Sequence, residues 1–204
     1  MVVAADARRS RRKSALVEVM MKTSLFAAAI VLSALIGLSG SVFAQSDQTL
    51  PIPGGEVAKD LPGAKELPDP NMMYKVVFDI ATAAPKVDDV NPGLTAVVRY
   101  VNTLAKNGVP ADHRKIAVVF HRGGTDIVMN NETFKARNDG HDNPNVALIQ
   151  SMKKAGVDFR VCGQAVLARK IDPKTVMPEI EVDLWALTTL VNLQLRGYVH
   201  VGLN

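Results

Sequence analysis

The sequence predicts an α/β fold of three layers, with a mostly parallel sheet of about five strands and helices on both faces. Two observations predict it. Short runs rich in β-branched and aromatic residues alternate with helical segments, and residues 116–120 are continuously apolar, as in a central strand buried on both sides. Strands joined by helical crossovers run parallel, and their helices cover both faces of the sheet.

The first strand and the first helix have clear signals. Residues 73–80 are rich in β-branched and aromatic residues, which predicts a strand. Asn91-Pro92 marks a helix start, with Asn91 as the N-cap and Pro92 at the first helical position. Apolar residues then follow the helical period from Leu94 until Asn107-Gly108 ends the helix.

The later elements follow the same alternation. Strands are expected at 115–120, 157–161 and 198–201, and a short edge element at 125–129. Helices are expected from Asn130 or Asn131 to 136, from the capping signature Asn143-Pro144 to Gly156, at 165–170 and at 182–195. The acidic residues just before the last of these helices are expected to precede and cap it: Glu179, Glu181 and Asp183.

Residues 1–44 are typical of a secretory signal peptide. Lys22 precedes an apolar run at 25–38, and small residues lead to Ala44, after which we expect cleavage. The run is shorter than the roughly 20 residues of a membrane span, which favours a cleaved leader over a retained anchor. Translation from Met20 or Met21 would give a more ordinary leader, so the true start is open. The expected location is periplasmic or secreted.

Residues 45–71 contain five prolines and three glycines and show no helical or strand period. Proline removes a hydrogen-bond donor and fixes one backbone angle, so this segment is expected to be an extended tether with little packing of its own. The folded α/β domain is expected to span residues 72–204.

The charge excludes one class of partner. Residues 1–44 hold six basic and two acidic residues, so the other 160 residues carry 18 of each from the totals of 24 and 20. Once the leader is removed the protein is neutral, which argues against nucleic acid as a partner. No membrane association is expected after cleavage.

Cys162 is the only cysteine, so no disulfide can form within the chain. Three interpretations stay open: an inert buried residue, an intermolecular link, or a reactive thiol. Cys162 follows the strand at 157–161, and the carboxyl ends of parallel strands are where reactive groups collect. It also precedes a predicted helix, whose positive end would stabilise a thiolate.

His121 ends the second strand, so it is expected either to face the same crevice as Cys162 and assist thiolate formation, or to be a loop histidine bound by backbone groups. Gly123-Gly124 suggests a tight turn or a close backbone approach to a ligand. Neither GxGxxG nor a Walker pattern is present, and the four histidines lack metal-ligand spacing, so we expect no cofactor and no metal.

Several of these pieces together resemble the DsrE/DsrF-like family over residues 73–204. They are the segment 157–171 with Cys162-Gly163-Gln164, the strand end at 118–121 with its glycine loop, and Leu195-Arg196-Gly197-Tyr198. The resemblance implies a parallel α/β fold, assembly into trimers or hexamers, a sulfur donor or acceptor protein as partner, and a cysteine at Cys162 that carries sulfur as a persulfide. The signal peptide is a departure, because the best understood sulfur-relay members work in the cytoplasm.

Two functional hypotheses follow. In the first, the protein handles sulfur, with Cys162 accepting sulfane sulfur as a persulfide and relaying it to a partner, as a carrier or as a sulfurtransferase. In the second, it is a non-catalytic oligomeric binding or structural module of the periplasm, and Cys162 is inert.

Overall fold

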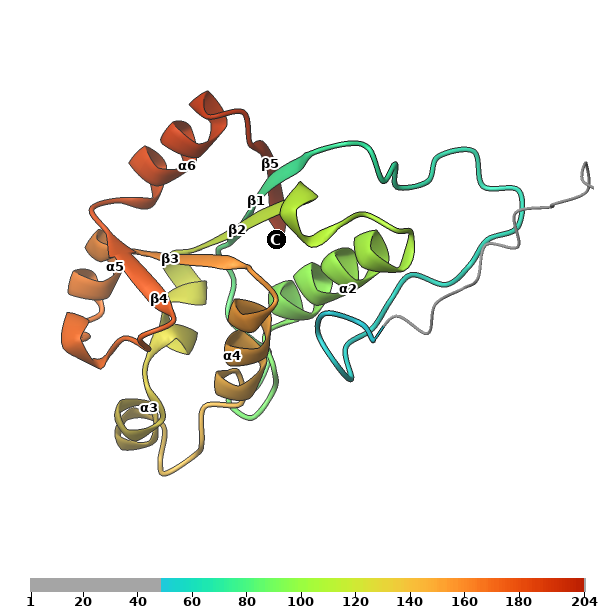
Figure 1. Cartoon of the computed structure of the whole chain (residues 1–204). Coiled ribbons are helices and arrows are strands. Elements are labelled where there is room, and N and C mark those ends of the chain that lie inside the picture. Colours follow the sequence, from blue (N-terminus) through green and yellow to red (C-terminus); the bar gives the residue numbers. More distant parts are fainter. Residues whose placement is uncertain (1–48, 204) are drawn as a thin grey trace, which may run out of the picture. The chain divides into compact units, whose positions relative to one another are not determined.

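A computed structural model describes residues 49–203, which form a five-stranded parallel sheet in the order β4-β3-β2-β1-β5 (Figure 1). The strands are β1 (Tyr74–Ile80), β2 (Arg114–Phe120), β3 (Asp158–Cys162), β4 (Ile180–Asp183) and β5 (Val199–Leu203). The helices are α2 (Pro92–Lys106), α3 (Asn131–Arg137), α4 (Val146–Lys154), α5 (Gly163–Ala168) and α6 (Ala186–Leu195), with 3-10 helices at Ala111–His113, Arg122–Val128 and Pro173–Thr175. The predicted α/β class is confirmed.

The sheet is built outward from β1. The chain places β2, β3 and β4 in turn on one side of β1, and α6 then leads to β5 on the other side. β4 and β5 are therefore the two edges of the sheet. Among residues 49–203, none of the helices combines the length and the apolar character that a membrane crossing requires.

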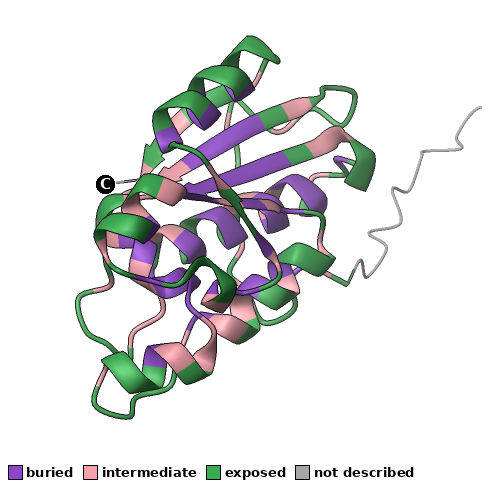
Figure 2. Cartoon of the chain, turned by 90° about the vertical axis from the view of Figure 1, so that its left-hand side faces the viewer, coloured by how far each residue is buried: buried purple, intermediate pink, exposed green. Residues whose placement is uncertain are grey.

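Two hydrophobic cores lie on opposite faces of the sheet. The larger core packs α2 and α4 against alternate residues of the strands, among them Val118, Phe120 and Phe159. The smaller core packs α6 against the other alternate residues, and its members are Val77, Ala117, Val119, Cys162, Ala186, Leu190 and Leu193. Figure 2 shows the buried residues concentrated in the strands and on the inward sides of the helices. Cys162 thus belongs to the α6 face.

The predicted start of α2 is confirmed, because the side chain of Asn91 accepts a hydrogen bond from Gly93 N at 2.8 Å. The start of α4 differs from the prediction. The helix begins at Val146 with Asn145 in the N-cap position, and the Asn143 side chain instead donates to the backbone oxygens of Ile127 and Met129. Asn143 is used to tie two loops together, a role that its local sequence does not reveal.

The region 179–195 also differs from the prediction. The expected helix at 182–195 begins only at Ala186, and the acidic residues before it do not cap a helix, because residues 180–183 form the edge strand β4. The expected edge element at 125–129 is instead the end of a 3-10 helix, with one isolated bridge from Met129 to Val176. For residues 180–183, pairing with β3 is a tertiary interaction, and it overrides the helical pattern that their sequence shares with α6.

Residues 49–71 form no helix or strand, but the expectation of little packing is wrong for part of them. Ile52 is completely buried against α2, and the buried side chain of Asn102 hydrogen bonds to the backbone of residues 52–56. The start of this segment is therefore part of the fold. The predicted signal peptide at 1–44 lies outside the described residues.

Candidate functional site

Cys162 is the last residue of β3 and the N-cap residue of α5, and only 4% of it is exposed. Its side chain takes no part in capping the helix. α5 has six residues, so it offers few aligned peptide dipoles to stabilise a thiolate. Any activation of the thiol would have to come from neighbouring side chains.

The segment between β4 and α6 lies against Cys162 and its neighbours. Asp183 pairs with Cys162 across the two strands. A Cβ atom on Gly163 would lie 2.6 Å from the backbone oxygen of Asp183, and Gln164 Nε2 donates to the oxygen of Leu184 at 3.2 Å. Residues 183–185, the β4–α6 segment, therefore pack against the first two residues of α5.

His121 follows β2 on the same face of the sheet as Cys162. Its backbone is extended (φ −156°, ψ 176°), so it continues the alternation of Ala117 and Val119, which face α6. The β2–β3 register, extended by one residue from Phe120 opposite Val161, places His121 opposite Cys162. Neighbouring strands are about 4.8 Å apart, so the structure brings these two predicted residues together on one face. Within residues 49–203 no hydrogen bond joins their side chains.

Two further residues of this face were missed in the sequence. The Asp79 carboxylate, near the end of β1, accepts a hydrogen bond from His121 Nε2 through Oδ1, and His200 Nε2 on β5 lies 3.4 Å from its Oδ2. The side chain of Asp79 is 16% exposed. The available signal was an acidic residue near the carboxyl end of a mostly apolar strand, although nothing local indicated its partners.

The pKa of Asp79 lies below its ordinary value. Burial by itself raises this pKa, but the hydrogen bond and charge of His121, with a smaller contribution from His200, outweigh that effect. Asp79 is therefore an anion at neutral pH and can only accept hydrogen bonds. The proton between the two groups therefore belongs to Nε2 of His121, and in the neutral form of the ring Nδ1 is the nitrogen that accepts.

Arg160 lies two residues before Cys162 on the same face and is paired with three carboxylates. Its guanidinium is 2.9 Å from Asp158, 3.3 Å from Glu181 and 3.4 Å from Asp183. Burial lowers the pKa of Arg160, but these carboxylates, Asp158 foremost, raise it above the ordinary value. The positive charge is neutralised by the chain itself, so Arg160 offers little stabilisation to a thiolate at Cys162.

The glycines after His121 serve the packing of the chain itself. A Cβ atom on Gly124 would lie 2.3 Å from the backbone oxygen of Ile80, and one on Gly123 would lie 2.9 Å from that of Ala81. The close approach expected at Gly123-Gly124 is thus to the end of β1, and this contact explains the two glycines without a ligand. It also holds His121 next to Asp79.

The remaining histidines have separate partners. His113 Nδ1 is 3.0 Å from the oxygen of Pro70, and His141 Nδ1 is 2.7 Å from Asp88. Within the described part of the chain, no group of three or more histidine, cysteine or acidic residues is arranged to hold a metal ion.

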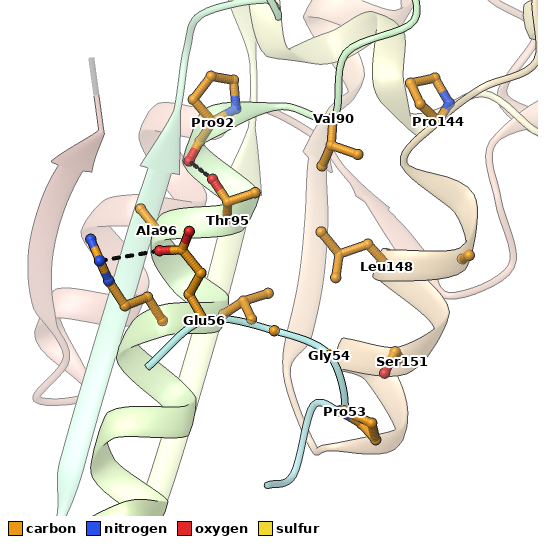
Figure 3. A pocket seen from close by; sticks show the side chains of 14 residues that line it. Pro53, Gly54, Glu56, Val90, Pro92, Thr95, Ala96, Pro144, Leu148 and Ser151 are labelled. Atoms are coloured by element: carbon orange, nitrogen blue, oxygen red, sulfur yellow. Dashed lines mark hydrogen bonds and ion pairs between the residues drawn. The ribbon is translucent and has the colours of Figure 1, made fainter. Parts of the chain in front are cut away.

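A separate cavity of about 640 Å³ lies between residues 53–56, α2 and α4 (Figure 3). Its walls are mostly apolar, with Leu148 and Val90 on one side and the Arg99–Glu56 ion pair on the other. α2 and α4 cover the face of the sheet opposite to Cys162. This cavity is therefore not part of the thiol site.

Comparisons with known proteins place these features in a family. A search of the curated proteins found no match. Among solved structures, a protein of unknown function from Methanobacterium thermoautotrophicum, MTH1491, is 19% identical, with a TM-score of 0.47 over 64% of this chain and 99% of that chain. The family model described as "DsrE/DsrF-like family" matches residues 65–202, which is most of the chain and includes Asp79, His121, Cys162 and His200. The chain therefore belongs to the DsrE/DsrF-like family.

Proposed function

We propose that this protein handles sulfur, with Cys162 accepting sulfane sulfur as a persulfide and passing it to a partner protein. The observation that carries the proposal is the position of the sole thiol at the carboxyl end of β3, on the same face as a hydrogen-bonded histidine–carboxylate pair. Membership in a family generally associated with sulfur relay supports it.

The chemistry needs no external oxidant. The Cys162 thiolate attacks the outer sulfur of a persulfide or polysulfide donor, a new S–S bond forms, and the S–S bond of the donor breaks. The rest of the donor leaves with the electron pair of that bond, as a thiolate from a persulfide or as hydrosulfide or a shorter polysulfide from inorganic polysulfide. Transfer to a partner repeats this exchange, with a thiolate of the partner attacking the outer sulfur carried by Cys162.

The test is the intact mass of the full chain before and after incubation with inorganic polysulfide. We expect a gain of one or more sulfur atoms in mass that is reversed by dithiothreitol and is missing in Cys162→Ser. A wild-type protein that gains no sulfur, although Cys162 reacts with a thiol reagent under the same conditions, would rule the proposal out.

The alternative function is an oligomeric binding or structural module in which Cys162 is inert, and the burial of the thiol favours it. Titration with a thiol reagent separates the two. A sulfur carrier requires Cys162 to react in the native protein, which needs movement of the surrounding elements, because the thiol is buried in the smaller core beneath α6. A thiol that reacts only after denaturant is added would instead support the module.

We also propose that the protein is exported and that its working form begins after Ala44. The support is in the sequence, where an apolar run at 25–38 is followed by small residues. N-terminal sequencing of the protein purified from the producing cell tests this. A first residue at Gln45 is expected, and a mature chain that starts before Met20 would contradict it.

Homo-oligomers are part of the same proposal. The outer side of α6 presents three exposed apolar residues, Leu187, Val191 and Leu195, each spaced four apart and so on one side of the helix. We call these three residues the α6 stripe. An exposed apolar stripe of this kind is typical of a subunit interface, and we propose a second copy of this chain as its partner.

A further inference from the structure

A carboxylate between two histidines lies next to the proposed sulfur site. Asp79 is on β1, His121 follows β2, and His200 is on β5, so Asp79 stands on the central strand of three. His200 pairs with Val77 across the strands, and Val77 faces α6. All three groups and Cys162 therefore lie on one face of the sheet.

We propose that Asp79 is a positioning residue that makes His121 the proton acceptor for Cys162. By accepting the Nε2–H bond, Asp79 fixes the ring and leaves the lone pair on Nδ1, the nitrogen that is free to take a proton. The Sγ–H bond of Cys162 breaks, its proton moves to Nδ1 directly or through one water molecule, and the electron pair stays on sulfur. This inference rests on the proposed function and deepens it.

The imidazolium that forms would be held between two negative groups. Its Nε2–H bond remains on the Asp79 carboxylate, and the new Nδ1–H bond faces the thiolate. The arrangement follows the general logic of an activated nucleophile, in which the base next to the nucleophile is oriented by a third group. Asp79 touches neither the thiol nor the sulfur donor, so its effect would pass through His121.

The charged groups around Cys162 make the direction of the change informative when Asp79 is replaced, because a positioning role and a purely electrostatic role predict opposite changes in thiolate formation. Asp183 pairs with Cys162 on the neighbouring strand, Arg160 is neutralised by three carboxylates, and His200 contacts the far oxygen of Asp79. If Asp79 acted on the thiol only through its negative charge, its removal would favour the thiolate. The proposed role predicts the reverse.

The experiment is alkylation of Cys162 by iodoacetamide in the full chain, followed by mass spectrometry from about pH 5 to about pH 9, where thiols titrate. The iodoacetamide concentration is kept in the range where the alkylation rate is proportional to it, so that the opening of the site does not limit the rate. For Asp79→Asn and His121→Gln we expect an alkylation rate near neutral pH that is lower by about tenfold or more. In Asp79→Asn the amide can reverse the tautomer of His121, and in His121→Gln the proposed proton acceptor is removed.

Three variants serve as matched controls. Asp79→Glu keeps the anion and should restore part of the rate. His200→Gln leaves the Asp79–His121 pair in place and should stay within about threefold of wild type, because it removes only the longer contact. Asp183→Asn removes the carboxylate of the residue opposite Cys162 on β4, so its rate should equal or exceed that of wild type.

The ring nitrogens give a second readout that is independent of alkylation. In ¹⁵N NMR spectra, His121 should carry its proton on Nε2 in the wild-type protein and lose that preference in Asp79→Asn. Circular dichroism and thermal melting establish that each variant is folded. An alkylation rate in folded Asp79→Asn that equals or exceeds the wild-type rate would overturn the inference, as would a His121 ring protonated on Nδ1 in wild type.

The outcome is separable from that of the proposed function. If polysulfide adds no sulfur to Cys162 but Asp79→Asn slows alkylation, the sulfur-carrier proposal fails and the role of Asp79 stands. If wild type and Asp79→Asn both form the persulfide and are alkylated equally fast, the sulfur-carrier proposal stands and Asp79 has no positioning role.

Discussion

At the scale of single residues, Asn102 fixes the segment that precedes the sheet. Its fully buried side chain accepts a hydrogen bond from Ile52 N at 3.1 Å and donates to the backbone oxygens of Ile52, Gly55 and Glu56 at 3.0 to 3.3 Å. Asn102→Ala leaves the buried N–H of Ile52 without a partner, whereas the oxygen of Ile52 keeps its hydrogen bond from Gly55 N, and a buried unpaired group costs about 1 to 3 kcal/mol. We expect urea denaturation to show a loss of stability of at least that size.

Asn192→Ala is the matched control, because Asn192 is an exposed asparagine on α6, and it should change the free energy of unfolding by less than about 0.5 kcal/mol. Limited proteolysis provides a second measurement. Residues 49–58 should be cleaved faster in Asn102→Ala than in wild type. Equal stability of Asn102→Ala and wild type would show that these hydrogen bonds do not stabilise the fold.

Asp79 makes stability depend on pH in a defined direction. Its pKa is lowered in the folded protein, mainly because the interaction with His121 outweighs burial. The unfolded chain therefore binds the proton first as the pH falls, and the stabilisation present above the unfolded pKa of about 3.9 is lost as the pH falls through the folded value. We expect wild type to lose more stability than Asp79→Asn between about pH 5 and about pH 3.

Denaturation by urea at the two pH values measures this difference. Asp112→Asn is the control. It removes an exposed carboxylate that is not part of the group formed by Asp79, His121 and His200, so it should lose as much stability as wild type. A loss in Asp79→Asn equal to that of wild type would mean that the hydrogen bond to His121 does not stabilise the fold.

At the scale of elements, the start of α5 packs closely against the end of β4, next to Cys162. A Cβ atom on Gly163 would lie 2.6 Å from the oxygen of Asp183, which is backbone and cannot rotate away. Gly163→Ala should therefore displace the β4–α6 segment, with a cost of about 1 to 3 kcal/mol for overpacking. We expect lower stability and faster reaction of Cys162 with a thiol reagent.

Gln164→Ala, the neighbouring substitution, removes only a surface hydrogen bond to Leu184 and should cost less than about 1 kcal/mol. The thiol reaction rate is the informative measurement, because it reports on the cover over Cys162 rather than on the whole fold. If Gly163→Ala reacts no faster than wild type, the β4–α6 segment does not limit access to the thiol.

The elements that the sequence predicts best are those whose signals are local. β1 and β2 are rich in β-branched residues, β3 has the apolar Phe159 and Val161 at alternate positions, and α2 carries its own cap in Asn91, so their places follow from a few neighbouring residues. β4 was missed because its acidic residues Glu181 and Asp183 gain their partner, Arg160, only across the sheet. Asn143 was misassigned for the same reason, since its hydrogen bonds reach residues 127 and 129.

The residues of the candidate site also divide into those with a local signal in the sequence and those defined only by the fold. Cys162 and His121 can be found from the sequence, because each stands at a strand end that its own neighbours define. Asp79 and His200 become members of the site only through the sheet order β2-β1-β5, which brings β5 from the end of the chain to the side of β1. No pattern of spacing along the sequence contains that order.

At the scale of the whole molecule, the α6 stripe is the surface from which assembly can be predicted. Leu187, Val191 and Leu195 are 52%, 44% and 81% exposed, whereas Leu190 and Leu193 on the other side of the helix fill the smaller core. Full burial of a wholly exposed aliphatic side chain contributes about 1.5 to 3 kcal/mol, so each of these partly exposed residues would contribute a fraction of that, largest for Leu195. We therefore expect the protein to have a mass larger than that of one chain in light scattering after size exclusion.

Val191→Glu places a charge in the centre of this stripe without touching the core, so the variant should remain folded and have the mass of a single chain. Leu67→Glu is the matched control, because Leu67 is 62% exposed and lies outside α6, and this variant should keep the wild-type mass. If wild type has the mass of one chain, or if Val191→Glu and wild type have the same larger mass, the α6 stripe is not the interface between subunits. A folded single-chain Val191→Glu that still gains sulfur at Cys162 would further show that one subunit contains the whole thiol site.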